Sequence, residues 1–567
     1  METLEYDVAV IGAGPMGIVA ARFYMDIHPT CRLVILEQDM VVGGVWSSAR
    51  QYEGFRSESG LRMTGFSDMP VTLPEDAEKY HDTFEAKYVT KYLEEYVDNH
   101  VYNGRSLRDR IIFGYQVQSL EKIDDIWNLR GGTNDAKTIR SLRLVVASGY
   151  NSIPYIPAFP NQYHFQGPIV HQKEFGQISK TVLAADSAYT SISVIGGGKS
   201  AADMVYDCVK AGKKVHWIVR KTGEGPAAFA GAQGRGQYKN GAEMSATRFF
   251  AGLSPSCFTP KSWWTRAIHQ SSFGNNMTTK IWKGADKAAA DLARFDSRDG
   301  ALPGFGRLKP NTEIFWCNGP IGLIHHDDFW DTVAKNVYAY RSDIQGLDSN
   351  SIVLEDGSKV PADILFCGTG WSHKYPFLTE KQIVEFGLPH PPEDDPEPTS
   401  AMWTSLLEAA DRQVVSDFPK LGDPPDHYHK ERNLTPSRLY NGIAPLNDDS
   451  IVFVGHVVLS NAFRSAEAQA IWVTAYFDGN AKIPPSEQAT KEIAYANAFS
   501  KRRYPAHGAT GNYFHLDLVG YTDKLMADVG LKSHKQKGWL GNFMDPCIAS
   551  DYKDMKGEYL QKYGSTI

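Results

Sequence analysis

Residues 6–17 read YDVAVIGAGPMG, and this stretch decides the fold class. Its apolar first half predicts a buried parallel strand, which breaks at a G-x-G-x-x-G turn and runs into a helix. The first glycine permits the tight turn, the second lets the backbone approach a pyrophosphate, and the third lets the helix pack closely on the strand. Free N–H groups at the start of the helix then face the phosphates. The candidate cofactor-binding residues of this turn are Gly12, Gly14, Pro15, Met16 and Gly17.

An acidic residue stands where the next strand ends. Residues 32–36 predict a second strand, and Glu37 follows it, twenty positions after Gly17. At this spacing a carboxylate binds a ribose hydroxyl of a dinucleotide. The alternative is a structural glycine turn in another kind of α/β protein. The strand, the turn, the helix and the acid all occur at the spacing of a dinucleotide-binding fold, which disfavours this alternative.

Residues 193–203, SVIGGGKSAAD, repeat the pattern with alanine in place of the third glycine. The following strand, residues 215–219, ends in Arg220, and a guanidinium can hold a 2′-phosphate that a carboxylate would repel. We therefore expect FAD at the first turn and NADPH, rather than NADH, at the second. The alternative for Arg220 is a solvated basic residue at a strand end. The candidate NADPH-binding residues are Gly196, Gly198, Lys199, Ser200, Ala201 and Arg220.

Composition and charge disfavour several classes of protein. A chain of 567 residues can hold two or more domains, and its net charge of −7 argues against broad nucleic-acid binding. No apolar run approaches the ~20 residues of a membrane helix, so we expect no transmembrane segment. The six cysteines form no C-x-x-C pair. This disfavours a zinc site and the dithiol of disulfide reductases, and it favours a reducing, cytoplasmic location.

One cluster, HHDD at residues 325–328, invites a metal-site interpretation. Adjacent side chains on a turn or helix rarely converge on one ion. We therefore expect no metal site and interpret Asp327 or Asp328 as the cap of a helix that begins near Phe329.

Residues 165–175, FQGPIVHQKEF, carry the pattern F-x-G-x-x-x-H-x-x-x-F. This pattern resembles the identifying sequence of the flavin-containing monooxygenases, which are related to the Baeyer–Villiger monooxygenases. The resemblance extends over residues 5–475: GGVW at 43–46 is similar to the family's flavin loop, VASG at 146–149 and DILFCGTG at 363–370 to its two domain crossovers, and FVG at 453–455 to its closing flavin segment. It adds the candidate cofactor-binding residues Gly44, Val45, Trp46 and Gly370.

The resemblance implies an α/β fold with two Rossmann-like dinucleotide-binding domains, in which the NADPH domain is inserted into the FAD domain. We expect the first part of the FAD domain at residues 1–175, the NADPH domain at 176–370, and the second part of the FAD domain with a C-terminal extension at 371–567. Residues 223–306 fit the pattern poorly and are interpreted as an insertion. This insertion either covers the active site or is a surface excursion unrelated to function.

The activity that the resemblance implies is that of a flavin-dependent monooxygenase. NADPH would pass hydride to FAD, the reduced flavin would capture O2, and the resulting C4a-(hydro)peroxyflavin would deliver one oxygen atom to a small organic substrate. Phe175-Gly176 stands where Baeyer–Villiger enzymes carry tryptophan, which favours oxygenation of nitrogen or sulfur. The alternatives are Baeyer–Villiger oxidation of a ketone, an NADPH oxidase that releases H2O2, and a redox-sensing scaffold without turnover. A homo-oligomer is compatible with the sequence.

Two residues, Glu58 and His171, are candidates for a catalytic role. Aligning Phe66-Ser67-Asp68 and Pro70 with the family places Glu58 where its members present an asparagine to the flavin. A neutral amide can donate a hydrogen bond there, whereas an ionised glutamate cannot. Glu58 is therefore protonated in a dry site, serves as a base, or points elsewhere. His171 either transfers a proton or is a hydrogen-bonded residue of the hinge between the domains.

Overall fold

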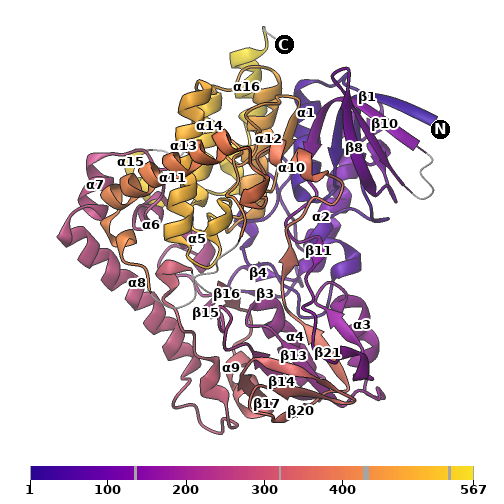
Figure 1. The fold of residues 1–567 in the computed structure, drawn as a ribbon, viewed down its shortest axis with the longest axis vertical. Coiled ribbons are helices and arrows are strands. Elements are labelled where there is room, and N and C mark those ends of the chain that lie inside the picture. Colours follow the sequence, from indigo (N-terminus) through magenta and orange to yellow (C-terminus); the bar gives the residue numbers. More distant parts are fainter. Residues whose placement is uncertain (1, 133–136, 318–320, 426–432, 534–537, 566–567) are drawn as a thin grey trace.

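Two separate sheets organise the computed structural model, which describes residues 2–132, 137–317, 321–425, 433–533 and 538–565 (Figure 1). The first sheet consists of β1 (Glu2–Ile11), β2 (Leu33–Leu36), β7 (Ile111–Ile112), β8 (Val117–Ile123), β9 (Ile126–Gly131), β10 (Lys137–Val146) and β23 (Ile451–Phe453). Its strand order is β7-β2-β1-β10-β9-β8, with β23 also paired to β10. The strands β7, β2, β1, β10 and β23 are parallel, and β9 and β8 extend the sheet in antiparallel fashion.

Both faces of β1 are buried, which explains its continuous apolar sequence. Val8 and Val10 pack in a core that includes α1 (Pro15–Ile27), α2 (Ala86–Asn99) and α12 (Ala462–Phe477). Ala9 and Ile11 point the other way, into a core shared with β8 and β9. Further helices lie beside α1 and α12, namely α11 (Glu397–Asp417), α13 (Ser486–Arg503), α14 (Leu518–Val529) and α16 (Met555–Tyr563) (Figure 1).

The second sheet is entirely parallel and lies below the first in Figure 1. It consists of β12 (Ile169–His171), β13 (Ser191–Ile195), β14 (Lys214–Val219), β17 (Val337–Arg341) and β21 (Ile364–Cys367), in the order β12-β21-β13-β14-β17. α3 (Phe175–Val182), α4 (Lys199–Lys210) and α9 (Phe329–Asn336) accompany these strands. α9 begins at the residue predicted for it. The predicted α/β class is confirmed.

The chain passes between the two sheets twice. Its two passages meet where β11 (Ile153–Pro154) pairs with β22 (Trp371–Ser372). The predicted boundary at residue 371 coincides with the return passage. β12, which precedes the boundary predicted at residue 175, pairs with β21 and therefore belongs to the second sheet. The domain boundaries stay predictions.

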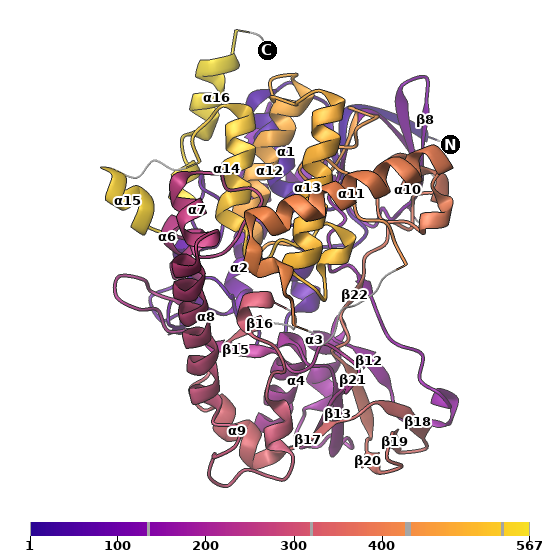
Figure 2. The same ribbon diagram turned by 60° about the vertical axis from the view of Figure 1, so that its left-hand side comes forward.

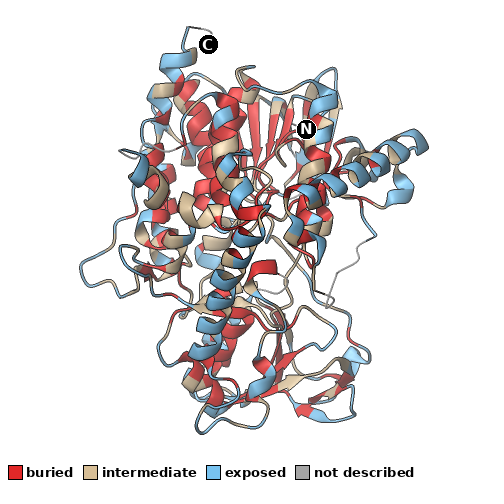
Figure 3. Cartoon of the chain, turned by 90° about the vertical axis from the view of Figure 1, so that its left-hand side faces the viewer, coloured by how far each residue is buried: buried red, intermediate tan, exposed pale blue. Residues whose placement is uncertain are grey.

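The segment interpreted as an insertion folds into β15 (Ala228–Gly231), α5 (Gly241–Ser245), α6 (Arg248–Gly252), α7 (Trp263–His269) and α8 (Ser272–Ala293). The long α8 runs from the C-terminal helices down to the second sheet (Figure 2), and much of its length is exposed (Figure 3). Arg248 pairs with Asp523 of α14 at 2.7 Å, and Phe258 packs edge-on against Phe514 and Tyr521. The insertion thus connects the second sheet to the C-terminal helices. In the described ranges, no helix combines the length and the apolar character that crossing a membrane would require.

Candidate active site

Two glycines, Gly12 directly after β1 and Gly17 in the first turn of α1, pack so closely against their neighbours that no side chain fits. Gly12 has φ +108°, and a Cβ added to it would lie 2.5 Å from the carbonyl oxygen of Ala147. A Cβ on Gly17 would lie 2.0 Å from the carbonyl oxygen of Gly12. α1 begins directly after this turn, with Gly14 as its N-cap and Pro15 as its first residue. Among the described residues no side chain caps α1, so its first N–H groups can bind a phosphate.

The GGVW loop lies against the same turn. The N–H of Gly43 donates to the carbonyl oxygen of Ala13 at 2.9 Å. A Cβ on Gly44 would lie 3.2 Å from Cα of Gly14, and Val45 and Trp46 follow in a short 3-10 turn. The two glycine-rich segments that the sequence assigns to FAD are therefore neighbours in space.

Glu37 joins this site from the end of β2. Its carboxylate is buried and accepts the N–H groups of Ala13 at 2.7 Å and Asp39 at 2.9 Å. Burial raises the pKa of Glu37, although these hydrogen bonds oppose the rise. Each carboxylate oxygen has a second lone pair, so Glu37 can still accept a ribose hydroxyl. Met16 borders the same edge, since a Cβ on Gly455 would lie 3.0 Å from its Cγ.

The second glycine turn has the same architecture. Gly196 has φ +131°, and its Cβ would lie 2.2 Å from the carbonyl oxygen of Gly368, at the end of β21. α4 starts next, with Gly198 at its N-cap and Ser200 in its first turn. Ala201 is fully buried, and only 2.8 Å would separate its Cβ from a Cβ on Gly368. This close approach explains why a small residue replaces the third glycine.

Lys199, predicted to bind NADPH, has its charge balanced by the protein. Its Nζ lies 2.6 Å from Oδ1 of Asp203 and 3.8 Å from Oε1 of Glu58. Burial lowers the pKa of Lys199, but the two carboxylates raise it by more. Arg220, in contrast, is exposed directly after β14.

Glu58 is held by side-chain and backbone groups from two later segments of the chain, the start of α4 and residues 323–325. Its Oε1 lies 3.5 Å from Nε2 of His325 and receives the N–H of Leu323 at 3.5 Å. Burial raises the pKa of Glu58, but His325 and Lys199 outweigh it, and the net pKa falls below the usual range. The side chain of Glu58 is nevertheless 45% exposed to solvent. Glu58 was expected to be a protonated acid in a dry site, a base, or a side chain that points elsewhere. This geometry disfavours the protonated acid.

A column of aromatic rings connects the two sheets beside Glu58. Trp46 stacks on Phe55 at 5.2 Å, Phe55 stacks on Tyr52 at 5.0 Å, and Tyr52 meets Phe175 edge-on at 5.3 Å. The hydroxyl of Tyr52 donates to Asp203 at 3.0 Å. The segment that carries Glu58 is therefore fixed to the GGVW loop on one side and to α3 and α4 on the other.

His171 is fully buried between the two passages of the chain. Its Nε2 lies 2.7 Å from the carbonyl oxygen of Gly370, and its Nδ1 accepts the N–H of Lys173 at 3.2 Å. A carbonyl can only accept, so the proton is on Nε2 and the ring is neutral. Burial lowers the pKa of His171, which further disfavours the protonated ring. The geometry favours the hinge role, because Nε2 joins β12 to the second crossover and Nδ1 is occupied by the N–H of Lys173.

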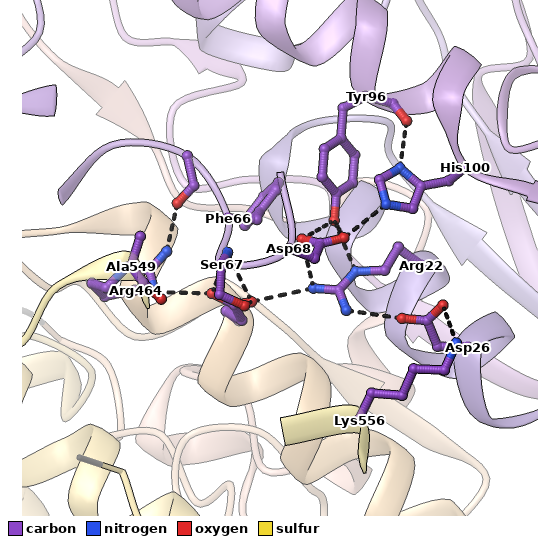
Figure 4. Close-up of polar contacts among 12 residues, drawn as sticks. Arg22, Asp26, Phe66, Ser67, Asp68, Tyr96, His100, Arg464, Ala549 and Lys556 are labelled. Carbon is purple, nitrogen blue, oxygen red and sulfur yellow. Dashed lines mark hydrogen bonds and ion pairs between the residues drawn. The ribbon is translucent and has the colours of Figure 1, made fainter. Parts of the chain in front are cut away.

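A buried charged cluster surrounds Arg22 of α1, the helix that follows the first glycine turn (Figure 4). Arg22 of α1 lies 3.0 Å from Asp26, 3.3 Å from Asp68 and 3.2 Å from Glu467. Glu467 also pairs with Arg464 at 2.9 Å. The cluster ties α1 to α12 and to the loop before Pro70. Nothing in the local sequence indicated it, because its members come from segments that lie far apart in the chain.

In the described part of the chain, no three histidine, cysteine, aspartate or glutamate side chains converge as metal ligands would. The HHDD residues instead have separate partners. Asp327 accepts the hydroxyl of Tyr80, and Asp328 that of Tyr206, each at 2.7 Å.

Two glycine turns, each at the carboxyl ends of parallel strands, are typical of proteins that bind dinucleotides. A family model described as pyridine nucleotide-disulphide oxidoreductase matches residues 9–228. An FAD-dependent monooxygenase of Pyrenophora dematioidea is 30% identical over 94% of this chain and 99% of its own. Another, resA of Aspergillus sclerotiorum, is 29% identical over 98% of both chains. The protein belongs to the family of FAD-dependent monooxygenases.

Solved structures agree on the fold. The open crystal structure of cyclohexanone monooxygenase covers 92% of this chain and 97% of its own, with 17% identity and a TM-score of 0.59. The S-allyl-L-cysteine S-oxygenase of Allium sativum covers 99% of this chain and 93% of its own, with 14% identity and a TM-score of 0.51. The comparisons confirm the predicted flavin-dependent monooxygenase class, with FAD and NADPH as cofactors. The individual binding residues stay predictions.

Proposed function

We propose that this enzyme uses NADPH and FAD to transfer one atom of O2 to a nitrogen or sulfur atom of a small organic substrate. The proposal rests above all on the two glycine turns, one followed by an acid and the other by an arginine. FAD would bind at residues 12–17 with Glu37, and NADPH at residues 196–201 with Arg220. Each sheet would then be a Rossmann-like domain, with the NADPH domain running from β12 to β21.

FAD, once bound and reduced, would react with O2. No side chain of the protein can perform this chemistry. The chain's own residues bind, orient and exclude water. The N–H groups at the starts of α1 and α4 would hold the pyrophosphates. His171 would hold β12 to the second crossover through the carbonyl oxygen of Gly370, and the aromatic rings between Trp46 and Phe175 would limit access of water between the sheets.

Glu58 favours a second candidate, Baeyer–Villiger oxidation of a ketone. That reaction needs an anionic oxygen nucleophile, which a protonated carboxylic acid at this position would neutralise. Glu58 is held as a carboxylate by His325 and Lys199 and has no proton to donate. Phe175-Gly176 nevertheless favours the heteroatom branch.

Product analysis separates the candidates. The purified holoenzyme would be given NADPH and, in turn, a thioether, a tertiary amine and a cyclic ketone, with NADPH, H2O2 and products all measured. A sulfoxide or N-oxide supports the proposal, whereas a lactone without either oxide supports the second candidate. H2O2 equal to the NADPH consumed, with no product from any substrate, would contradict both and identify an oxidase.

A further inference from the structure

A cavity of about 520 Å³ lies between the insertion and the C-terminal helices. One wall is the segment between α6 and α7, residues 256–261. The other walls come from α13, between residues 488 and 497, from Lys524 of α14 and from residues 439–442. This volume lies in the range of about 300–1,000 Å³ in which proteins bind small molecules.

The cavity is a different space from the one proposed for FAD and NADPH. Phe514, which lines it, belongs to a segment that runs beside the residues following β23, and its N–H donates to the carbonyl oxygen of Val458 at 3.0 Å. A Cβ on Gly442, also in the wall, would lie 2.2 Å from Cγ2 of Val457. Among the described residues, those of the two glycine turns and Glu58 take no part in the lining.

Aromatic rings from several segments meet in the wall of the cavity. Phe258 of the insertion meets Phe514 edge-on, with 4.9 Å between the ring centroids. Phe418, directly after α11, and Tyr495 of α13 add two further rings. Surroundings of this kind bind a flat aromatic molecule by burying its apolar area and by contacts between rings.

The charged side chains of the wall are balanced within the protein. Three lysines that line the cavity each pair with a carboxylate: Lys261 with Asp417 at 2.6 Å, Lys491 with Glu487 at 2.6 Å, and Lys524 with Asp528 at 2.8 Å. The fourth charged group of the wall, Glu492, lies 4.0 Å from Lys524. These groups leave no excess positive charge, so an anionic ligand would lose its hydration without gaining a partner.

The tyrosine hydroxyls of the wall are also occupied. Tyr440 donates to Glu492 at 3.3 Å and accepts from Lys524 at 2.9 Å, and Tyr495 donates to Asp417 at 2.7 Å. Burial raises the pKa of both tyrosines, so both hydroxyls stay protonated. A ligand would therefore be held chiefly by the aromatic and aliphatic side chains.

We propose that this cavity binds a neutral, aromatic small molecule at a site separate from the flavin. Its volume, its rings and its internally balanced charges favour such a ligand over an anion. The inference goes beyond the proposed oxygenation and does not depend on it. The insertion would form one wall of a second binding site, rather than a surface excursion unrelated to function.

Calorimetry on the FAD-loaded enzyme without NADPH tests this site with a matched pair of probes. 2-Naphthol and 2-naphthoate share two fused rings, but only the naphthoate is charged at neutral pH. We expect a Kd for 2-naphthol of about 1 mM or below, at least about fivefold lower than that for 2-naphthoate. Absence of binding, or a smaller preference for 2-naphthol, would overturn the proposal.

A substitution inside the cavity locates the bound probe. Ala496→Phe places a ring in the cavity, because Ala496 lines it from α13, and it should weaken 2-naphthol binding at least about tenfold. Ala285→Phe makes the same change at an exposed position of α8 and should leave Kd unchanged. If the two variants bind 2-naphthol equally well, the probe binds elsewhere and the proposal is wrong.

The flavin spectrum provides an independent readout of location. 2-Naphthol in the cavity should leave the spectrum unchanged, whereas a long-wavelength charge-transfer band that saturates at the calorimetric Kd would place the probe on the flavin and contradict the proposal. Should Ala496→Phe fail to fold or to retain FAD, Phe258→Ala removes a ring from the wall of the insertion. It should also weaken 2-naphthol binding, and an unchanged Kd would refute the site.

Discussion

Glu467→Gln should destabilise the unit that carries the first glycine turn. The side chains of Arg22, Arg464 and Glu467 are 4%, 2% and 2% exposed, so no solvent can replace the lost charge. Removing one partner of such a buried pair costs about 3–5 kcal/mol. Arg22 keeps Asp26 and Asp68, whereas Arg464 loses the carboxylate with which it pairs. The lower end, about 3 kcal/mol, is therefore expected.

Equilibrium urea unfolding followed by flavin fluorescence measures this loss, because FAD is released when its unit unfolds. Glu487→Gln is the matched control: the same chemical change on α13, at a side chain that is 83% exposed and pairs with Lys491 along the helix. The control should unfold at the wild-type midpoint. Equal midpoints for the two variants would refute the reasoning, since burial of the cluster would then contribute nothing.

Three further changes test other parts of the site. Gly17→Ala places a Cβ 2.0 Å from the carbonyl oxygen of Gly12, so the variant should lose FAD and purify without yellow colour. Gly284→Ala is the control, because the space around Gly284 is open, and it should keep a full flavin spectrum. Glu58→Gln removes the carboxylate between Lys199 and His325. The yield of H2O2 per NADPH consumed should then rise. An unchanged H2O2 yield would show that the contact is irrelevant to the reaction. Burial raises the pKa of Asp207 to about 7. The fold thus prefers it protonated, and stability is lost as pH rises toward and through 7. Asp207→Asn should flatten the dependence of Tm on pH and raise Tm at pH 8, and parallel wild-type and variant curves would count against this.

The two glycine turns were predictable because each is contained in about a dozen consecutive residues. Strand, turn and helix start follow one another at Gly12 and Gly196, and the closing acid or arginine lies one strand further on. The structure brings Gly44 of the GGVW loop against Gly14, and the role of both in binding FAD stays a prediction.

The structural features that the sequence did not predict have a common cause. Each depends on pairing between segments that are far apart in the chain. β12 has three residues and no periodicity of its own, so its membership of the second sheet depends on β21. Alignment located Glu58 but not its partners, since Lys199 and His325 lie on two other segments. The cavity beside the insertion carries no motif, because its walls come from segments between residues 256 and 524 that meet only in the fold.

In the proposed reaction, one atom of O2 enters the substrate at the expense of NADPH. Turnover of a thioether under 18O2, with the product analysed by mass spectrometry, follows that atom. We expect a sulfoxide carrying one 18O for each NADPH consumed. A product whose oxygen comes from water, or NADPH consumption that yields only labelled peroxide, would contradict it.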